Sequence, residues 1–149
     1  MLISCTKVEL PQSPLAAYRA DNMFKLYLSD VGLLVSLARI NFGEIVQEQT
    51  MMYRGFLTEN YVAQTFAHGH ELYYWTSGNM AEIDFLLNSS TGIIPVEVKS
   101  SENVRSRSLQ VYVEKYRPNY AIRVSARNFG WVQGIKSVPL YAVHCILSD

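Results

Sequence analysis

The fold is decided by residues 81–100, which read AEIDFLLNSSTGIIPVEVKS. Apolar and polar residues alternate along 81–87 and 93–99, and β-branched and aromatic residues are frequent in both segments, as is typical of strands. Residues 88–92 supply the small polar residues and the glycine of a turn. The stretch therefore predicts a β-hairpin.

The register of this hairpin can be worked out from the sequence. With a four-residue loop at 89–92, Asn88 lies opposite Ile93. Counting outward then places Asp84 opposite Glu97, and Glu82 opposite Lys99. Strand alternation predicts that these four charged side chains share one face, with the apolar residues at 83, 85, 96 and 98 on the other.

Two opposed carboxylates point to metal chemistry. The Cβ atoms of opposed residues are about 4.5–5.5 Å apart, so ionised Asp84 and Glu97 would repel each other. Mg²⁺ prefers carboxylate oxygens, lowers the pKa of a bound water and neutralises a phosphoryl oxygen, while Lys99 could orient that water. The alternative is an exposed sheet face with ion pairs from Glu82 to Lys99 and from Glu97 to a neighbour.

A third acid lies in a predicted helix over residues 55–67. Phe56, Val62, Ala63 and Phe66 are spaced to form one apolar stripe, and Glu59 falls on it. Because a buried carboxylate is costly without a partner, Glu59 should be paired. It is either a further acid of the same site or the partner of an arginine at the helix edge.

The other expected elements surround the hairpin. Residues 24–28 and 72–76 read as strands, and Ser29 or Asp30 can cap a helix that contains Leu33, Leu34 and Leu37. A helix is expected within 44–52 and another over 108–117, ended by Pro118, and the last strands are expected at 120–125 and 138–146. This order predicts an α/β (α+β) domain with a mixed central β-sheet flanked by helices.

Composition limits the class of protein. The chain has 149 residues, is 49% apolar and carries no net charge, which fits one globular domain and excludes a disordered chain or a uniformly basic coat protein. Cys5 and Cys145 show no metal-binding spacing, and no apolar run approaches membrane-spanning length. We therefore expect a cytoplasmic protein without a membrane partner.

The neutral total conceals an uneven distribution of charge. Between residues 99 and 136 the basic residues clearly outnumber the two acids, Glu102 and Glu114. Candidate contacts to a nucleic-acid backbone are Arg105, Arg107, Lys115 and Arg117. A solvated basic face or a dock for another domain is the alternative.

The charged motifs resemble those of a known superfamily. Glu59 on a helix, Asp84 within Glu-Ile-Asp-Phe, and the run Glu97-Val98-Lys99 resemble the PD-(D/E)XK nuclease-like pattern. More narrowly, the chain resembles, from about residue 24 to residue 141, a domain of unknown function at the C-terminus of prokaryotic AAA+-type ATPases. The motifs of this narrower resemblance are Phe24-Lys25-Leu26-Tyr27, Asp30-Val31-Gly32-Leu33-Leu34, Gly55 with Glu59-Asn60, Ala81-Glu82-Ile83-Asp84 and Pro95-Val96-Glu97-Val98-Lys99-Ser100.

The resemblance implies a restriction-endonuclease-like fold and a set of site residues. Asp84, Glu97 and the Val98 carbonyl would hold Mg²⁺ or Mn²⁺, Lys99 would be the catalytic lysine, and Glu59 would ligate directly or through water. The implied function is a metal-dependent phosphodiesterase acting on nucleic acid. The alternative is a catalytically inactive module that binds nucleic acid or protein and regulates the attached ATPase.

The resemblance also implies an N-terminal P-loop ATPase domain in the full-length protein. The phosphate-binding pattern Gly-x-x-x-x-Gly-Lys-Ser/Thr does not occur in this chain, so ATP hydrolysis is not assigned to it. Residues 1–20 are expected to be a connector or the tail of a missing winged-helix segment, and residues 21–149 the nuclease-like domain.

Overall fold

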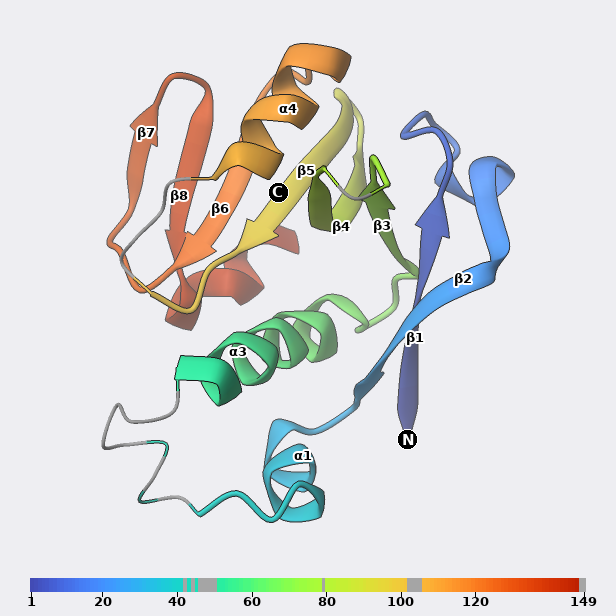
Figure 1. The fold of residues 1–149 in the computed structure, drawn as a ribbon. Coiled ribbons are helices and arrows are strands. Elements are labelled where there is room, and N and C mark those ends of the chain that lie inside the picture. The colour runs from blue at the N-terminus through green and yellow to red at the C-terminus, as the bar shows by residue number, and fades with distance from the viewer. Residues whose placement is uncertain (42, 44, 46–50, 79, 102–105, 148–149) are drawn as a thin grey trace.

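The computed structural model describes residues 1–149 apart from 42, 44, 46–50, 79, 102–105 and 148–149 (Figure 1). The strands are β1 (Leu2–Val8), β2 (Arg19–Leu28), β3 (Leu72–Thr76), β4 (Glu82–Ser89), β5 (Gly92–Val98), β6 (Ala121–Ser125), β7 (Gly130–Val132) and β8 (Ile135–Pro139). The α-helices are α1 (Val31–Leu37), α3 (Met51–Phe66) and α4 (Arg107–Tyr116), and the 3-10 helices are η1 (Leu15–Tyr18) and η2 (Leu140–Leu147).

All eight of these strands form one mixed sheet in the order β2-β1-β3-β4-β5-β6-β8-β7. Neighbours pair in parallel at β1 with β3, β5 with β6, and β6 with β8, and the other pairs are antiparallel. The predicted α/β class with a mixed sheet and flanking helices is confirmed.

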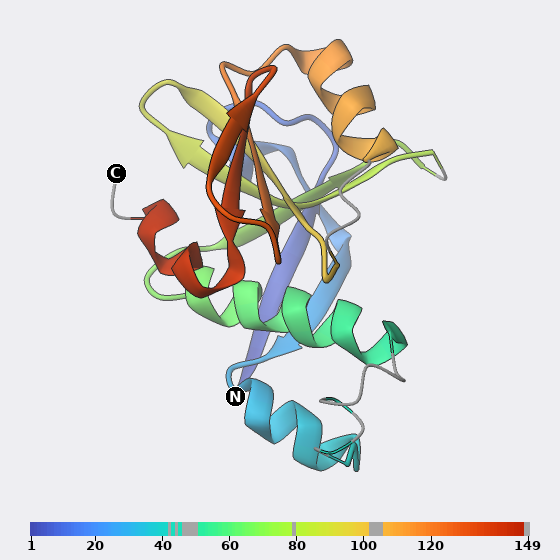
Figure 2. The same cartoon turned by 90° about the vertical axis from the view of Figure 1, so that its left-hand side faces the viewer.

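The sheet separates two apolar clusters. Alternate residues of β3 belong to different clusters, since Tyr74 lies with the α3 residues Val62 and Phe66, whereas Trp75 lies with the α4 residues Leu109 and Tyr112. The strands run between α4 and α3 in Figure 2. We call the two sides of the sheet the α3 side and the α4 side.

Local sequence explains where the helices begin and end. Asp30 caps α1 by accepting a hydrogen bond from the Leu33 amide at 2.7 Å, and Ser106 caps α4 through the Leu109 amide at 3.0 Å. Arg117 ends α4 in the left-handed conformation, directly before Pro118. The three helices predicted at these positions are confirmed, with α3 beginning at Met51. The helix expected within 44–52 falls largely outside the described residues.

The hairpin has the predicted register but a shorter turn. Asn88 lies opposite Ile93 and Phe85 opposite Val96, as predicted, while Ser89 pairs with Gly92 and leaves a two-residue turn in place of four. Gly92 has a φ of 122°, which L side chains rarely adopt.

Strict alternation along β4 is wrong, because a bulge interrupts it. Two steps along β3, from Tyr73 to Trp75, correspond to three steps along β4, from Leu86 to Ile83. Ile83 therefore packs on the α4 side and Phe85 on the α3 side. The extra residue changes the direction of the side chain of Asp84, which lies between Ile83 and Phe85.

Two other expectations need correction. Residues 2–8, within the expected connector, form β1, which pairs with both β2 and β3 inside the sheet. The strand expected at 138–146 is replaced by β8 and η2, because Pro139 has no amide hydrogen with which to continue the sheet. The domain boundary at residue 21 and the relation to a winged-helix segment stay predictions.

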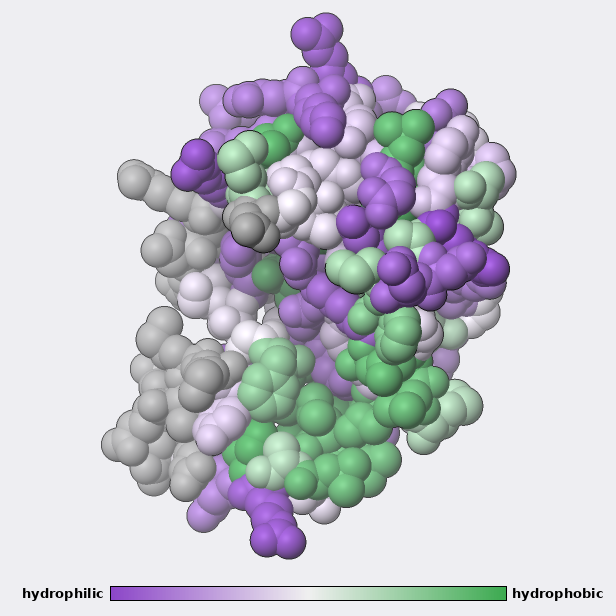
Figure 3. All heavy atoms as spheres, turned by 45° about the vertical axis from the view of Figure 1, so that its right-hand side comes forward, coloured by the Kyte–Doolittle hydropathy of each residue, from purple (hydrophilic) through white to green (hydrophobic). Residues whose placement is uncertain are grey.

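Part of the surface is apolar. Exposed residues of this kind gather on β1, β2, α1 and the start of α3, and hydrophobic side chains dominate the lower part of the face in Figure 3. They include Leu2, Phe24, Leu26, Leu33, Leu37 and Phe56. Of the helices in the described part of the chain, none has the length and apolar character needed to cross a membrane.

Candidate functional site

The first charged group is built around Lys25, and we call it the Lys25 cluster. Its ammonium group lies 3.0 Å from Glu59 Oε1 and 4.0 Å from Asp84 Oδ1, and it also donates to Glu82 Oε1. Tyr27, two residues along β2 and thus on the same face, donates its hydroxyl to Glu59 Oε1 at 2.5 Å. One cation is therefore shared by three carboxylates from α3 and β4.

Electrostatics in this cluster favour a positive charge. The carboxylates of Glu59, Glu82 and Asp84 hold the pKa of Lys25 above its ordinary value, although burial opposes its charge. Burial raises the pKa of Asp84 to about 7, helped chiefly by the charge of Glu59 and opposed by the Val98 amide and Lys25. The cluster thus carries more negative charge than Lys25 offsets.

The second charged group surrounds Glu97, and we call it the Glu97 cluster. Glu97 is only 2% exposed, and its strand neighbours Val96 and Val98 pack on the α3 side, so its side chain points to the α4 side. Its Oε1 accepts a hydrogen bond from Ser106 and lies 3.2 Å from Lys99 Nζ. Its Oε2 lies 3.9 Å from Arg123 Nε.

The two clusters meet at the end of the β4–β5 ladder. Asp84 Oδ2 accepts a hydrogen bond of 2.7 Å from the Val98 amide, the residue directly after Glu97. The charge of Glu97 also contributes, more weakly, to raising the pKa of Asp84. The four charged side chains predicted to share one face are thus divided between two adjoining groups, with Glu82 paired to Lys25 and Lys99 to Glu97.

The basic residues of the predicted nucleic-acid surface have different surroundings. Arg107 begins α4 and is exposed, whereas Lys115 packs its ammonium over the rings of Trp75 and Tyr116 at 5.6 and 5.0 Å. Arg117 ends α4, and Arg105 lies outside the described residues.

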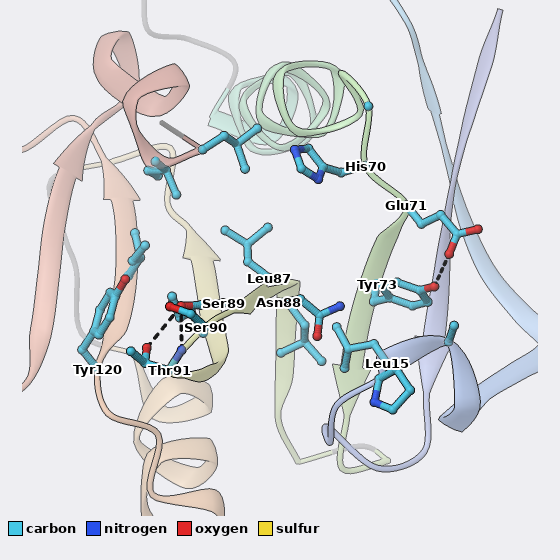
Figure 4. A pocket seen from close by; sticks show the side chains of 18 residues that line it. Leu15, His70, Glu71, Tyr73, Leu87, Asn88, Ser89, Ser90, Thr91 and Tyr120 are labelled. Atoms are coloured by element: carbon cyan, nitrogen blue, oxygen red, sulfur yellow. Dashed lines mark hydrogen bonds between the residues drawn. The ribbon is translucent and has the colours of Figure 1, made fainter. Parts of the chain in front are cut away.

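One cavity lies beside the Lys25 cluster, and another lies away from both clusters. An apolar groove of about 420 Å³, lined by residues such as Leu26, Leu34 and Phe56, reaches Lys25 and Glu59. A separate cavity of about 700 Å³ lies between the β4–β5 turn and the loop before β3, where Tyr73 donates to Glu71 (Figure 4). None of the predicted catalytic residues lines this second cavity.

The donor chemistry of Asp84 and Glu97 fits a hard divalent cation. Glu97 Oε2 is buried and has no hydrogen-bond donor among the described residues, and burial together with the charge of Glu59 raises the pKa of Asp84, so a cation beside Asp84 would relieve the cost of its ionisation. Within the described ranges, no three Asp, Glu, His or Cys side chains are grouped closely enough to hold a metal ion. The pair thus fits better than a set that includes Glu59, which is held by Lys25 and Tyr27.

Sequence reasoning missed several residues of the two clusters. It expected Glu59 to be either a further acid of the metal site or the partner of an arginine, whereas its contacts in the structure are with Lys25 and Tyr27, which share one face of a strand. The alternation of Phe24-Lys25-Leu26-Tyr27 was a usable signal for that shared face. Ser106 and Arg123 carried no comparable signal, because they reach Glu97 only through tertiary packing.

Comparison with known proteins gives a family but no relative of known function. A family model described as Domain of unknown function (DUF4143) matches residues 54–143, from α3 to η2. This range includes Glu59, Asp84, Glu97 and Lys99. No curated protein and no solved structure matches the chain.

Proposed function

The chain belongs to the DUF4143 family of domains of unknown function, and we propose that it is a nuclease-like domain, a divalent-metal-dependent phosphodiesterase acting on nucleic acid. The observation that carries the proposal is the adjoining placement of Asp84 and Glu97, with Lys99 Nζ 3.2 Å from Glu97 Oε1 and the buried Glu97 Oε2 left without a donor among the described residues. The resemblance to the PD-(D/E)XK pattern supports the proposal. The P-loop ATPase domain that the narrower resemblance implies supports it as well.

Each residue has a separate task in this proposal. Asp84 and Glu97, with the Val98 carbonyl, would hold Mg²⁺ or Mn²⁺, which when bound supplies an acidic water and neutralises phosphoryl charge. Lys99 orients the attacking water beside Glu97. Ser106 and Arg123 fix the Glu97 carboxylate in place. Glu59, which Lys25 and Tyr27 hold on α3, would act on the metal only through water.

Cleavage by the purified chain tests this function. We expect hydrolysis of labelled single- or double-stranded DNA or RNA that requires Mg²⁺ or Mn²⁺. Asp84→Asn, Glu97→Gln and Lys99→Met should each reduce the rate at least about 100-fold, since each removes a group that acts in the transition state. Glu71→Gln, an acid-to-amide change in the separate cavity, should leave the rate unchanged. Absence of cleavage in the native chain, or cleavage that survives Asp84→Asn, would refute the proposal.

One observation favours a second function, a non-catalytic binding module that regulates the attached ATPase. Lys25 supplies a built-in positive charge to Glu59, Glu82 and Asp84, as a metal would. A module of this kind binds nucleic acid without cutting it. Its binding survives Asp84→Ala, weakens when Arg105 and Arg107 are replaced by alanine, and falls with rising salt.

A further inference from the structure

Two contacting pairs of aromatic side chains lie near the β7 edge of the sheet, and three of the four rings are exposed while Tyr120 is half-buried. They are Tyr120, Phe129, Trp131 and Tyr141, and we call this group the aromatic edge surface. Phe129 and Trp131 are each 60% exposed, and Tyr141 is 69% exposed. Large exposed rings gathered in one place mark a surface that binds something.

The rings are held against each other in pairs. Tyr120 and Trp131 have centroids 5.8 Å apart with their planes tilted by 40°, and Phe129 meets Tyr141 edge-on at 6.4 Å. Such contacts limit the motion of each ring while leaving a large part of it open to solvent. The surface is therefore arranged in advance for a flat ligand.

The chain segment that carries most of this surface has charge of one sign, although Lys115 and Arg123 lie on the α4 side. From residue 115 to residue 148 the sequence contains no Asp or Glu, and its basic residues are Lys115, Arg117, Arg123, Arg127 and Lys136. Lys136 lies directly opposite Trp131 in the β7–β8 pair. A ligand that suits both features is a polyanion that offers flat rings, because rings stack on aromatic side chains while the charges meet lysine and arginine.

Single strands satisfy this requirement better than duplexes. The bases of a duplex are stacked on each other inside the helix, whereas the bases of a single strand can stack on protein side chains. Because such stacking does not depend on base identity, the surface should tolerate many sequences.

The position of the surface separates it from Glu97. Glu97, Arg123, Ser137 and Gly130 are successive neighbours across β5, β6, β8 and β7. With neighbouring strands about 4.8 Å apart, three steps place β7 roughly 14 Å from Glu97. The rings face the other way, because Trp131 pairs with Lys136 and Lys136 with Ile122 of the α3 cluster, so they lie on the α3 side, whereas Glu97 points to the α4 side.

We propose that the aromatic edge surface binds the bases of a single-stranded nucleic acid, with the phosphates held by Lys136, opposite Trp131, and by Arg127, two residues before Phe129. Binding of this kind does not depend on the proposed phosphodiesterase function.

Tryptophan fluorescence gives a direct test of binding. The chain has two tryptophans, and Trp75 is 2% exposed and packed against Tyr112 and Tyr116, so quenching by a ligand reports on Trp131. Titration with a thymidine oligonucleotide in EDTA, where the proposed cleavage cannot proceed, should quench the emission. The affinity should fall as salt is raised, and a duplex of equal length should bind at least tenfold more weakly.

Variants measured with a labelled oligonucleotide complete the test. Trp131→Ala should weaken binding about tenfold or more, while Trp131→Tyr should retain most of the affinity. Phe24→Ala, which removes a ring of similar exposure at the opposite edge of the sheet, should leave the affinity unchanged.

Several results would overturn the proposal. One is that Trp131→Ala binds the oligonucleotide as tightly as the native chain does, and another is that a duplex binds as tightly as the single strand. A third is that mutation of Trp131 changes self-association of the protein and leaves oligonucleotide binding unchanged, which would indicate a protein interface. Binding without cleavage would refute only the phosphodiesterase function. Cleavage with unchanged binding by Trp131→Ala would refute only the aromatic edge surface.

Discussion

The Lys25 cluster and the Glu97 cluster adjoin each other but balance charge in opposite ways. In the first, one ammonium group is shared by three partly exposed carboxylates, and in the second, one buried carboxylate is surrounded by Ser106, Lys99 and Arg123. The first has surplus negative charge and the second surplus positive charge. Asp84, which belongs to the first cluster and bonds to the strand of the second, is where an added cation would have most effect.

The largest expected change comes from removing the shared cation. Lys25→Met leaves Glu59, Glu82 and Asp84 without their common partner, so we expect a loss of about 3 kcal/mol in the free energy of unfolding at pH 8. Urea unfolding in EDTA measures this loss. Arg19→Met is the control, because its ion pair with Asp21 is exposed and should be worth less than about 0.5 kcal/mol. Equal losses in both variants would show that the Lys25 cluster is no more than a surface network.

The next effect is a dependence of stability on pH that Asp84 causes. Its pKa of about 7 in the folded chain exceeds its ordinary value of 3.8, so the folded state binds this proton more tightly than the unfolded state. The resulting stability is fully present below about pH 4 and is lost as the pH rises through 7.

Asp84→Asn removes this titration. The variant should be more stable than the native chain by about 2 kcal/mol at pH 8 without metal, and the advantage should vanish near pH 4. Urea unfolding at a series of pH values in EDTA checks this. If both chains lose stability in parallel between pH 4 and pH 8, Asp84 is not the titrating group.

A smaller effect is expected in the Glu97 cluster. Ser106→Ala removes both the cap of α4 and a hydrogen bond to Glu97, which should cost about 1–2 kcal/mol in thermal or urea unfolding. Ser108→Ala is a matched control, because the Ser108 hydroxyl accepts only a 3.3 Å bond from the Glu82 amide. A cost no larger than that of the control would mean that Glu97 does not depend on Ser106.

Features set by short-range patterns were predictable from the sequence. The hairpin register follows from the turn residues between two alternating segments. The start of α1 follows from Asp30, and the end of α4 follows from Pro118. The pairing from Phe85 and Val96 to the turn was therefore predictable from the amino-acid sequence, whereas the direction of the Asp84 side chain was not.

Features set by tertiary packing were not predictable. The bulge at Asp84 exists because Ile83 packs on the α4 side and Phe85 on the α3 side, which no local pattern encodes. Lys25 is separated by 34 residues from Glu59 and by 57 from Glu82, so their pairing depends on β2 lying near α3 and β4. The division of the charged residues into two clusters follows from these long-range contacts.

A crystal structure with Mn²⁺ tests the central claim most directly. We predict an anomalous peak bound by carboxylate oxygens of both Asp84 and Glu97, with Lys99 beside it, and loss of that peak in Asp84→Asn. No peak between Asp84 and Glu97 in Mn²⁺-soaked crystals, with Lys25 still the only cation among Glu59, Glu82 and Asp84, would contradict the metal-dependent function.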